Sequence, residues 1–583
     1  MKTFTKTLFI ISLYACLSNA QIDSSLYFND NVSLLYPTME ITKFNNPSED
    51  YLFLGLTSGG SGNLLIVDNE LTPVFYRKAE GTVFNFTWQP DGELSYVIYP
   101  VFAYGLDSSG VEINRFYTPG GVALDVHDLR VLSDGSYYII GKELVTVDMS
   151  QYVSGGDTAA ALITNSVHHM DADDNEMWSW YAIDHYNILD VDQYVDLTQH
   201  QIDWTHCNSI EIDTDGNILL STRNFDEVTK IDRTTGDIIW RLGGEKNQFT
   251  FIDDTRGFSR QHSVRRLSNG NLIMFDNGHY LVPEYSSVVE YELDETNLTA
   301  TLVRRYTRNE SVFSQSRGGV QELPNGHILI SWGESQNPAV TEINEQDSVE
   351  FEMKFVSYAH QYRAYRFKWE TNLFAVSPDS IDFGIVAVGD SALAELKLYS
   401  TKDSSVTINE FFINDNSFSV LNELPITIPS QDSVTLSVMF KPTAEGYFKD
   451  RLNVRSVNDT MLIGKQVYLT GATTLVSVED RVNSPVQFSL SQNYPNPFNP
   501  STKIKFTIAK SPLPGWDGRG GLQLIKLVVY DLLGNEVTTL INKELPAGNY
   551  EIGFNGSNLP SGVYFYRLQA GSYSSTKKLV LLK

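Results

Sequence analysis

The chain has 583 residues, more than a single hydrophobic core usually organises, so we expect several domains. Apolar residues make up 42% and charged residues 20%, which excludes wholesale disorder and a collagen-like or coiled-coil chain. With 43 Lys and Arg residues against 71 Asp and Glu residues, the formal net charge of -28 would repel a phosphate backbone, so no nucleic-acid partner is expected.

Residues 1–20 have the pattern of a signal peptide, with two lysines, an apolar run and small residues before Gln21. A short buried helix and lipidation of Cys16 are the alternatives. No other stretch reaches the roughly 18 apolar residues that would cross a bilayer, so we expect no membrane span. Removal of the signal peptide leaves Cys207 as the one cysteine, so no intramolecular disulfide is expected despite export.

From about residue 48 to residue 365 the chain repeats a hairpin pattern, in which an Asp-Gly or Asn-Gly turn precedes a short strand rich in β-branched and aromatic residues. The turns are Asp91-Gly92, Asp134-Gly135, Asp215-Gly216, Asn269-Gly270 and Asn325-Gly326. A second hairpin alternates with the first, most clearly at residues 228–240. Two hairpins per unit of roughly 40 to 60 residues, repeated about six times, predict four-stranded blades around an axis.

The sequence therefore predicts an all-β fold class, with a six-bladed β-propeller at residues 21–375 followed by two Ig-like β-sandwich domains. A tandem of Ig-like domains is the alternative for the repeats. The spacing between equivalent turns is too short for sandwiches of about 100 residues each.

Residues 376–472 form the second predicted unit, which is rich in strand patterns and contains no histidine. Its segments Ile381-Asp382-Phe383-Gly384 and Val438-Met439-Phe440-Lys441-Pro442 resemble the Ig-like domains of the abnormal-spindle and hydin type. The resemblance implies a β-sandwich that serves as a spacer or docking domain. Because it has no histidine, we expect turnover not to need it.

A predicted linker at residues 473–486 leads to a C-terminal unit at residues 487–583. Its motifs are Tyr494-Pro495-Asn496-Pro497-Phe498, Val528-Val529-Tyr530-Asp531-Leu532-Leu533-Gly534, Ser561-Gly562-Val563-Tyr564-Phe565-Tyr566 and Lys577-Lys578-Leu579-Val580-Leu581-Leu582-Lys583. Together they resemble the sorting domain of type IX secretion cargo. The resemblance implies that the type IX secretion machinery is a partner. With the signal peptide, it implies a secreted or cell-surface, extracellular protein.

All ten histidines lie between residues 127 and 360, so chemistry should be sought in the predicted propeller. His127, His206 and His262 each stand at the start of a strand that leads to an Asp-Gly or Asn-Gly turn. Because equivalent positions in successive blades converge on a central channel, we expect these histidines and Arg223 to meet. Each histidine alone could be structural, and a tri-histidine metal centre is a rival interpretation.

The densest motifs of this region are His206-x-Asn208-Ser209-Ile210, Ser221-x-Arg223-Asn224, Trp240-Arg241-Leu242-Gly243-Gly244 and Gln261-His262. With them the chain resembles the arylsulfate sulfotransferase family, whose enzymes move a sulfuryl group between phenols without a nucleotide donor. The resemblance implies that His262 is the nucleophile that becomes a sulfohistidine. It also implies that Arg223, His206 and His127 are catalytic and that Asn208 and Asn224 bind substrate. No cofactor and no metal are expected.

Sulfuryl transfer resembles phosphoryl transfer, in which positioning and charge complementarity do most of the work. A neutral imidazole is a competent nucleophile near neutral pH, an arginine gives a forked donor, and a second histidine can protonate a departing phenolate. We therefore expect a secreted aryl-sulfate sulfotransferase that acts on a small-molecule aryl sulfate and a phenol by a ping-pong mechanism. The alternatives are a non-catalytic surface propeller that binds a glycan or protein partner, and a histidine-ligated, metal-dependent hydrolase or lyase.

Overall fold

The computed structural model describes residues 21–22, 36–473 and 489–582, apart from residues 59, 100, 309–311, 401, 459, 494, 509–522, 533–534, 546–547, 558 and 571–572. The predicted signal peptide and most of the predicted linker lie outside the described residues. The described chain is nearly all-β, as predicted, and its one α-helix is the short α1 (Ala182–His185). In these same ranges, no helix is long and apolar enough to cross a membrane.

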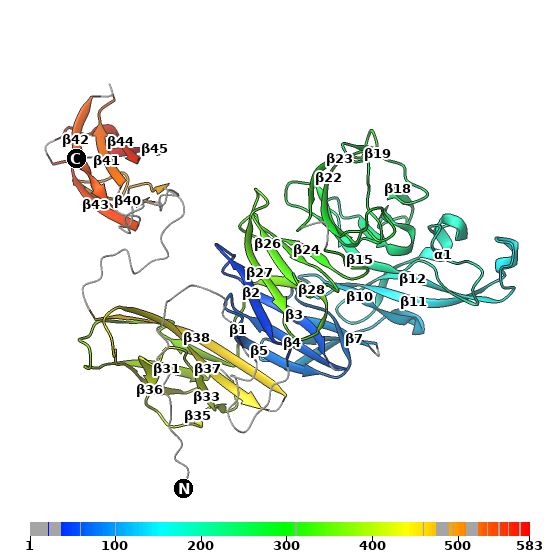
Figure 1. Ribbon diagram of the computed structural model, residues 1–583, viewed down its shortest axis with the longest axis horizontal. Helices are drawn as coiled ribbons and strands as arrows, with labels where there is room; N and C mark the ends of the chain where they lie inside the picture. Colours follow the sequence, from blue (N-terminus) through cyan, green and yellow to red (C-terminus); the bar gives the residue numbers. More distant parts are fainter. Residues whose placement is uncertain are drawn as a thin grey trace, which may run out of the picture.

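Six sheets, each built on a run of four strands, make up most of the described chain before residue 368 (Figure 1). The first holds β28 (His360–Phe367), β3 (Tyr51–Ser58), β4 (Ser61–Val67) and β5 (Pro73–Ala79). The second holds β6 (Thr82–Trp88), β7 (Leu94–Tyr99), β8 (Phe102–Leu106) and β9 (Glu112–Phe116). The third holds β10 (Ala123–Val131), β11 (Tyr137–Val147), β12 (Ala160–Met170) and β13 (Glu176–Tyr181), with β14 (Gln201–Asp203) beside β12.

The next three sheets repeat this plan. The fourth holds β15 (Cys207–Ile212), β16 (Ile218–Thr222), β17 (Glu227–Ile231) and β18 (Ile238–Gly243). The fifth holds β20 (His262–Arg266), β21 (Leu272–Asp276), β22 (Ser287–Asp294), β23 (Thr299–Tyr306) and β19 (Thr250–Ile252). The sixth holds β24 (Gly319–Glu322), β25 (Ile328–Ser331), β26 (Val340–Ile343), β27 (Val349–Phe355), β2 (Met39–Phe44) and β1 (Gln21–Ile22). The 3-10 helices of the described chain are η2 (Pro119–Gly121), η3 (Met149–Gln151), η4 (Ile188–Asp190) and η5 (Arg223–Phe225).

The six sheets surround a common centre. Their inner strands β28, β6, β10, β15, β20 and β24 contact one another in this order, and β24 contacts β28 in turn. The first sheet pairs β28, from the end of this region, with β3, from its beginning, so that His360 lies opposite Thr57. The ring is therefore closed by strands that are far apart in the sequence.

Both predicted hairpins are confirmed. In five sheets an Asp-Gly or Asn-Gly turn joins the inner strand to the next strand. The turn glycines all have positive φ, between 81° and 92°, a backbone conformation that glycine adopts at little cost; they are Gly92, Gly135, Gly216, Gly270 and Gly326. The second hairpin at residues 228–240 is the antiparallel pair β17 and β18.

The sheets bury both faces against their neighbours, as β16 shows. Every residue of this strand is buried. Leu220 packs in a cluster with Ile140 of the third sheet, and Leu219 packs in another cluster with Met274 of the fifth sheet. Because successive side chains of a strand point to opposite faces, one strand contributes to two cores.

After the sixth sheet, two layers of strands share one hydrophobic core that includes Leu396, Val438, Phe440, Leu452 and Leu469. One layer holds β29 (Phe374–Ser377), β31 (Ala392–Ser400), β36 (Ser433–Phe440) and β34 (Phe418–Val420). The other holds β30 (Ser380–Ile385), β38 (Met461–Ala472), β37 (Tyr447–Asn458) and β33 (Glu410–Phe412), and β32 (Val406–Ile408) pairs with β35 (Ile426–Ile428).

This sandwich continues the first sheet, an arrangement that the sequence did not predict. Strand β38 pairs antiparallel with β5, with Leu462 opposite Tyr76, and the two strands lie side by side in Figure 1. Arg451 of β37 also makes an ion pair with Asp68 at 2.8 Å. The outer edge of the first sheet is therefore covered by backbone pairing with the sandwich.

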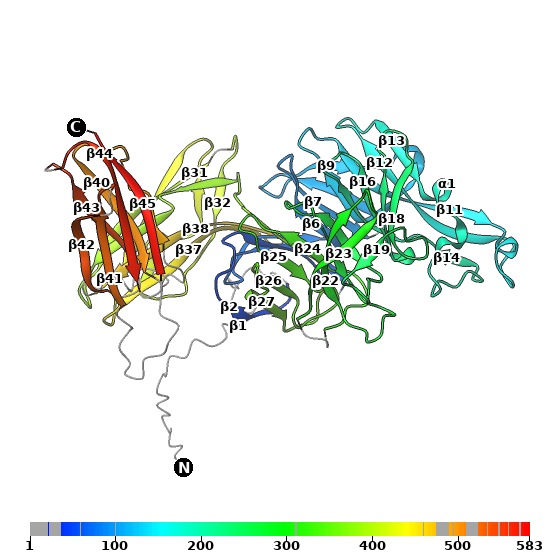
Figure 2. The same cartoon turned by 90° about the horizontal axis from the view of Figure 1, so that it is seen from above.

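The C-terminal strands form two further sheets around a separate core (Figure 2). One sheet holds β39 (Ser489–Leu490), β40 (Ser501–Ile508) and β43 (Gly548–Asn555), and the other holds β42 (Glu536–Leu545), β41 (Gln523–Tyr530), β44 (Gly562–Ala570) and β45 (Tyr573–Leu581). Phe498 of the proline-rich motif is buried in this core, and its N–H donates to Val580 O at 2.9 Å. The motif residues thus tie the two ends of the unit together.

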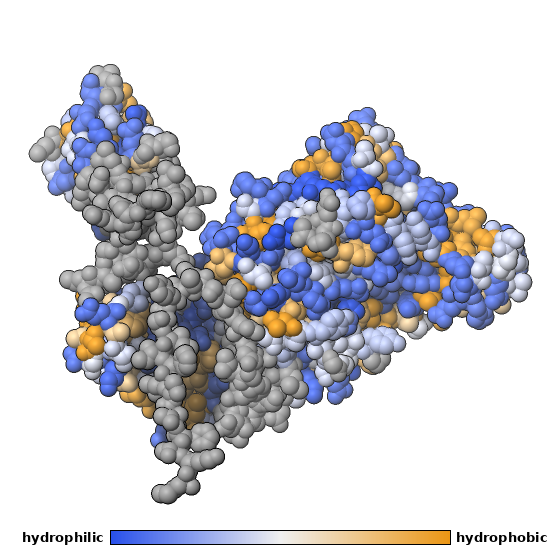
Figure 3. Space-filling model, viewed as in Figure 1, coloured by the Kyte–Doolittle hydropathy of each residue, from blue (hydrophilic) through white to orange (hydrophobic). Residues whose placement is uncertain are grey.

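The face of the molecule seen in Figure 3 is mostly hydrophilic, in keeping with the composition.

Candidate active site

The three predicted histidines lie on, or directly before, neighbouring inner strands. His127 is in β10, His206 directly precedes β15, and His262 begins β20. The ring centroids of His127 and His206 are 4.8 Å apart. The backbone N–H of Arg223, the first residue of η5, donates to His206 O at 3.1 Å. The charge of the Arg223 side chain also lowers the pKa of His206, after the larger effect of burial, so His127, His206 and Arg223 lie close together as predicted.

Tyr362 of β28 joins His262 to this group. Its ring centroid lies 5.8 Å from that of His127 and 6.3 Å from that of His262. Its hydroxyl donates to Asn208 O at 3.2 Å. Sequence reasoning missed this tyrosine, because β28 follows the last turn motif. The signal that could have found it is that a ring of sheets needs a closing strand, whose inward residues face the same centre.

Carboxylates orient two of the histidines. His206 Nδ1 lies 2.5 Å from Asp203 Oδ2, and His127 Nδ1 makes a short contact with Asp125. Burial lowers the pKa of His206, and Asp203 opposes this effect only in part. Each carboxylate fixes the proton on Nδ1, so Nε2 is the nitrogen available for exchange with a ligand.

His262 is held as a neutral imidazole with a defined tautomer. Its Nδ1 lies 2.7 Å from Asn277 Oδ1 and 3.0 Å from Arg260 O, and both oxygens are acceptors, so Nδ1 carries the proton. The amide of Asn277 is oriented in turn, since its Nδ2 donates to Ser314 O and Arg317 O at 2.9 Å each. The lone pair is therefore on Nε2.

The electrostatic surroundings keep His262 uncharged. The side chain is 1% exposed, and burial lowers its pKa well below the ordinary value. The positive charge of Arg223 lowers this pKa further, while the hydrogen bond to Asn277 acts in the opposite direction. The backbone N–H of Arg317 donates to Nε2 at 3.3 Å. A buried, neutral imidazole with its lone pair at Nε2 is the form that a nucleophile requires.

A second arginine, Arg260, lies beside Arg223. Arg223 Nη1 donates to Asn224 Oδ1 at 3.1 Å, and Arg260 makes a short hydrogen bond to the same oxygen. Burial and the charge of Arg260 lower the pKa of Arg223. Arg260 is itself paired with Asp192, so Arg223 is the guanidinium group left to favour an anion beside it.

A surface cavity of about 270 Å³ opens beside these arginines. Tyr194 and Tyr280 stack at its edge, with ring centroids 3.9 Å apart, and Arg260 lies over the Tyr280 ring at 5.2 Å. The part of the lining nearest the histidines is Asp203, Arg223, Asn224 and Arg260. The cavity thus combines aromatic surface with the two guanidinium groups and the carboxylates of Asp196 and Asp203.

The two predicted substrate-binding asparagines are both engaged with protein groups. Asn208 is fully buried and its Nδ2 donates to Gln261 O at 2.7 Å, next to His262, while its Oδ1 has no partner within the described residues. Asn224 Nδ2 donates to Asp203 O at 2.7 Å. In this structure Asn208 steadies the backbone before His262, and Asn224 orients the arginines.

Other candidate groups have structural surroundings. Burial raises the pKa of Cys207 to about 12, so its thiol is poorly suited to act as a nucleophile. Burial lowers the pKa of His168 to about 4, and its ring contacts the hydroxyl groups of Ser166 and Ser179. Among the described residues no three His, Cys, Asp or Glu side chains form a metal-binding group.

The class of protein that these features define is an all-β protein with a polar centre and appended β-domains. A family model described as arylsulfotransferase (ASST) matches residues 20–366. The chain belongs to the arylsulfotransferase family, and this match supports a sulfotransferase function. An abnormal-spindle and hydin (ASPM-SPD-2-Hydin) domain matches residues 372–461, and a secretion system C-terminal sorting domain matches residues 492–582.

Solved structures resemble the chain only distantly. A protein of unknown function from Bacteroides caccae is 15% identical, with a TM-score of 0.36 over 55% of this chain and 99% of its own. Virginiamycin B lyase from Staphylococcus aureus is 9% identical, with a TM-score of 0.30 over 54% of this chain and 88% of its own. A PapD-like domain of human CEP192 is 12% identical, with a TM-score of 0.15 over 18% of this chain and 88% of its own. No curated protein matches the chain.

Proposed function

We propose that the chain is an aryl-sulfate sulfotransferase that moves a sulfuryl group from a phenolic sulfate ester to an acceptor phenol, through a sulfohistidine at His262. No nucleotide donor takes part. The observation that carries the proposal is the hydrogen bond from His262 Nδ1 to Asn277, which leaves the lone pair of a buried neutral imidazole on Nε2. The family match supports the same class of reaction.

Two half-reactions account for the transfer. In the first, His262 Nε2 attacks the sulfur of the donor, an N–S bond forms, and the S–O bond to the aryl oxygen breaks. The departing phenolate takes a proton from Nε2 of His206 or His127 in the doubly protonated form of the ring, while Nδ1 stays hydrogen-bonded to the carboxylate. In the second, the acceptor phenol returns a proton to that histidine, its oxygen attacks the sulfur, and the N–S bond breaks. Arg223 offsets the negative charge of the sulfuryl oxygens in both steps.

The charge around His262 favours this proposal over a metal-dependent hydrolase or lyase. Arg223 lies near enough to lower the pKa of His262, whereas the charge of Arg260 is offset by its ion pair with Asp192. A metal cation bound at His262 would meet the repulsion of Arg223, whereas a sulfate ester is attracted by it.

The architecture that we propose is a six-bladed β-propeller at residues 21–375, an Ig-like sandwich at 376–472, a linker at 473–486 and a sorting domain at 487–583. The contacts between neighbouring inner strands support the blade count, and the family matches support the two appended domains. The sorting domain supports secretion or a cell-surface location. We propose that a signal peptide and the type IX machinery act in turn to reach it.

Steady-state kinetics test the reaction. The rate at which the coloured phenol is released from a chromogenic aryl sulfate is measured at several concentrations of the acceptor phenol. Double-reciprocal plots of this rate should give parallel lines, because a covalent intermediate separates the half-reactions. Arg223→Ala should slow both half-reactions by about 10²–10³-fold, since one donor to the sulfuryl oxygens is lost. Arg233→Ala, at an exposed turn, is the matched control and should keep the wild-type rate. Intersecting lines, or a wild-type rate in Arg223→Ala, would contradict the proposal.

A further inference from the structure

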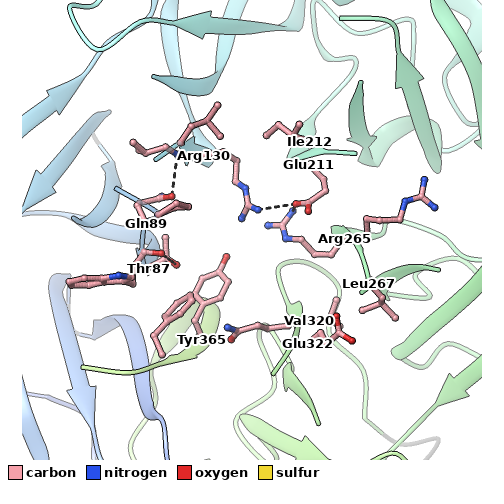
Figure 4. A pocket seen from close by; sticks show the side chains of 17 residues that line it. Thr87, Gln89, Arg130, Glu211, Ile212, Arg265, Leu267, Val320, Glu322 and Tyr365 are labelled. Atoms are coloured by element: carbon pink, nitrogen blue, oxygen red, sulfur yellow. Dashed lines mark hydrogen bonds and ion pairs between the residues drawn. The ribbon is translucent and has the colours of Figure 1, made fainter. Parts of the chain in front are cut away.

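A second cavity, of about 400 Å³, lies at the other end of the same centre. The candidate active site uses the beginnings of the inner strands, where His262 starts β20. The second cavity uses the ends of all six inner strands, with Trp88, Arg130, Glu211, Arg265, Glu322 and Tyr365 among its lining residues. Figure 4 shows the labelled side chains around its open centre. The two cavities therefore open at opposite ends of the ring.

Two guanidinium groups share one carboxylate in this cavity. Arg130 Nη2 donates to Glu211 Oε2 at 3.0 Å, and Arg265 Nη1 lies 3.7 Å from the same oxygen. Arg265 also reaches Asp128 at 3.4 Å, but Asp128 is already paired with the fully buried Arg363 at 3.1 Å. Three guanidinium groups are thus balanced by two carboxylates, which leaves positive charge at the cavity.

The other charged groups of the lining are already engaged. Arg266 is bound by Asp213 at 2.7 Å and by Glu295 at 3.2 Å. Both oxygens of Glu322 accept hydrogen bonds from Ser268, at 2.7 and 2.8 Å. Because Ser268 is neutral, Glu322 keeps its negative charge. The excess of positive charge is local to Arg130 and Arg265, which share Glu211 and Asp128 with Arg363.

Arg130 has donors to spare. A guanidinium group carries five N–H donors in a planar fork. Within the described residues, the side chain of Arg130 makes one hydrogen bond, to Glu211, and about a third of the side chain is exposed. Figure 4 shows its guanidinium group directed into the open centre of the cavity. A carboxylate or sulfonate group fits such a fork with two parallel hydrogen bonds.

Aromatic side chains form the facing wall. Trp88, Tyr365 and Phe367 line the cavity, and the rings of Tyr365 and Phe367 stack with centroids 5.9 Å apart. The Tyr365 hydroxyl donates to Asn85 Oδ1 at 2.7 Å, which holds this ring in place. A volume of about 400 Å³ is in the range of small-ligand sites, which combine apolar surface with a few placed polar groups.

We propose that this cavity is a binding site for a small aromatic anion, a carboxylate or a sulfonate, whose acid group is held by Arg130 and Arg265 and whose ring lies against Trp88, Tyr365 and Phe367. On a chain with a net charge of -28, Arg130 and Arg265 offer such an anion a local positive charge. The inference does not depend on sulfuryl transfer at His262, because it uses other residues at the opposite end of the ring.

Calorimetric titration with benzenesulfonate tests this site. The sulfur of benzenesulfonate is bonded to carbon and not to an ester oxygen, so this probe cannot donate a sulfuryl group at His262. The titrations use the full chain with Arg223→Ala, which weakens anion binding at the histidine end. One binding event per chain is expected at low salt. Adding Arg130→Gln should weaken it at least tenfold, and Arg130→Lys, which keeps the charge but loses the fork, should weaken it less. Adding Glu211→Gln should tighten it several-fold, because the competing carboxylate is removed.

The controls decide between outcomes. Arg233→Gln, at an exposed turn, should leave the binding unchanged, and circular dichroism should confirm that every variant is folded. Methanesulfonate should bind at least tenfold more weakly than benzenesulfonate, because it cannot use the aromatic wall. The proposal is overturned if the Arg223→Ala chain does not bind benzenesulfonate, or if Arg130→Gln and Arg130→Lys both bind it as well as their parent. If methanesulfonate binds as tightly as benzenesulfonate, the proposed contact between the ligand ring and the aromatic side chains is overturned.

Discussion

At the scale of the residue, the reactivity of His262 depends on its neighbours more than on its own chemistry. Burial and Arg223 lower its pKa, and the neutral amide of Asn277 only partly opposes them. The imidazole therefore stays neutral as the pH falls below about 6.5, the ordinary pKa of histidine. Because the amide cannot change its charge, the tautomer is independent of pH in this range.

A pH profile tests this state of His262. Activity that needs the neutral ring is lost as the pH falls through the lowered pKa, so the acidic limb of kcat/KM should lie below pH 6.5 or so. Asn277→Asp keeps an oxygen beside Nδ1 and adds a negative charge, which stabilises the imidazolium and raises the pKa of His262. The limb should then move to higher pH by about one unit or more.

The profile is measured with a donor whose phenol leaves without protonation, so that titration of His206 and His127 has little influence. Asn175→Asp, in an exposed turn, serves as the control and should not move the limb. A limb that stays in place in Asn277→Asp would mean that His262 is not the group whose protonation limits the reaction.

The sequence could predict only those site residues that stand beside a recurring motif. His127, His206 and His262 precede recurring turns, so their common direction could be predicted from the repeat. Tyr362 precedes no such turn, because it lies on the strand that closes the ring. The role of Arg260 depends on a shared contact with Asn224, and a contact between two sheets has no local pattern.

At the scale of the element, the most consequential contact is the pairing of β38 with β5. Leu462 of β38 is 1% exposed and packs in the core cluster of the first sheet with Leu65 and Tyr76. Arg455 Nη2 also donates to Pro73 O at 3.0 Å. The first sheet carries Tyr362 on β28, so the sandwich supports a sheet that contributes to the candidate active site. That turnover does not need the sandwich stays a prediction.

A single substitution measures this support. Leu462→Ala removes buried methyl groups and leaves a cavity between the sandwich and the first sheet, so the free energy of unfolding should fall by about 2–5 kcal/mol. Leu393→Ala, at a position of the same sandwich that is 63% exposed, is the control and should have a small effect. Urea denaturation of the full chain gives both values. Equal effects of the two substitutions would show that the pairing of β38 with β5 contributes little.

At the scale of the whole molecule, the order of the units could be predicted because each has its own sequence signature. The turn repeat indicated the ring, and the terminal motifs indicated the sorting domain, which the family match confirms. The docking of the sandwich could not be predicted in the same way. An edge strand such as β5 offers backbone groups to any partner, so its side chains say little about which strand will pair with it.

The sorting domain makes a prediction about the whole chain. Deletion of residues 487–583 should leave the folded ring of sheets in the periplasm, because the domain that the type IX machinery reads would be missing. Cell fractionation with an activity assay checks the location. The matched control is a chain of full length with Lys503→Gln, on a strand of the same domain, which should be secreted normally. Normal secretion of the shortened chain would contradict the assignment.

The central claim is that His262 carries the sulfuryl group between donor and acceptor. Its most direct test is mass spectrometry of the full chain, mixed with aryl sulfate alone, quenched without acid and digested. The account predicts a sulfuryl adduct on the peptide that contains His262, its loss on addition of phenol, and its absence in His262→Ala. An adduct on any other residue, or a turning-over enzyme that never forms an adduct, would contradict the account.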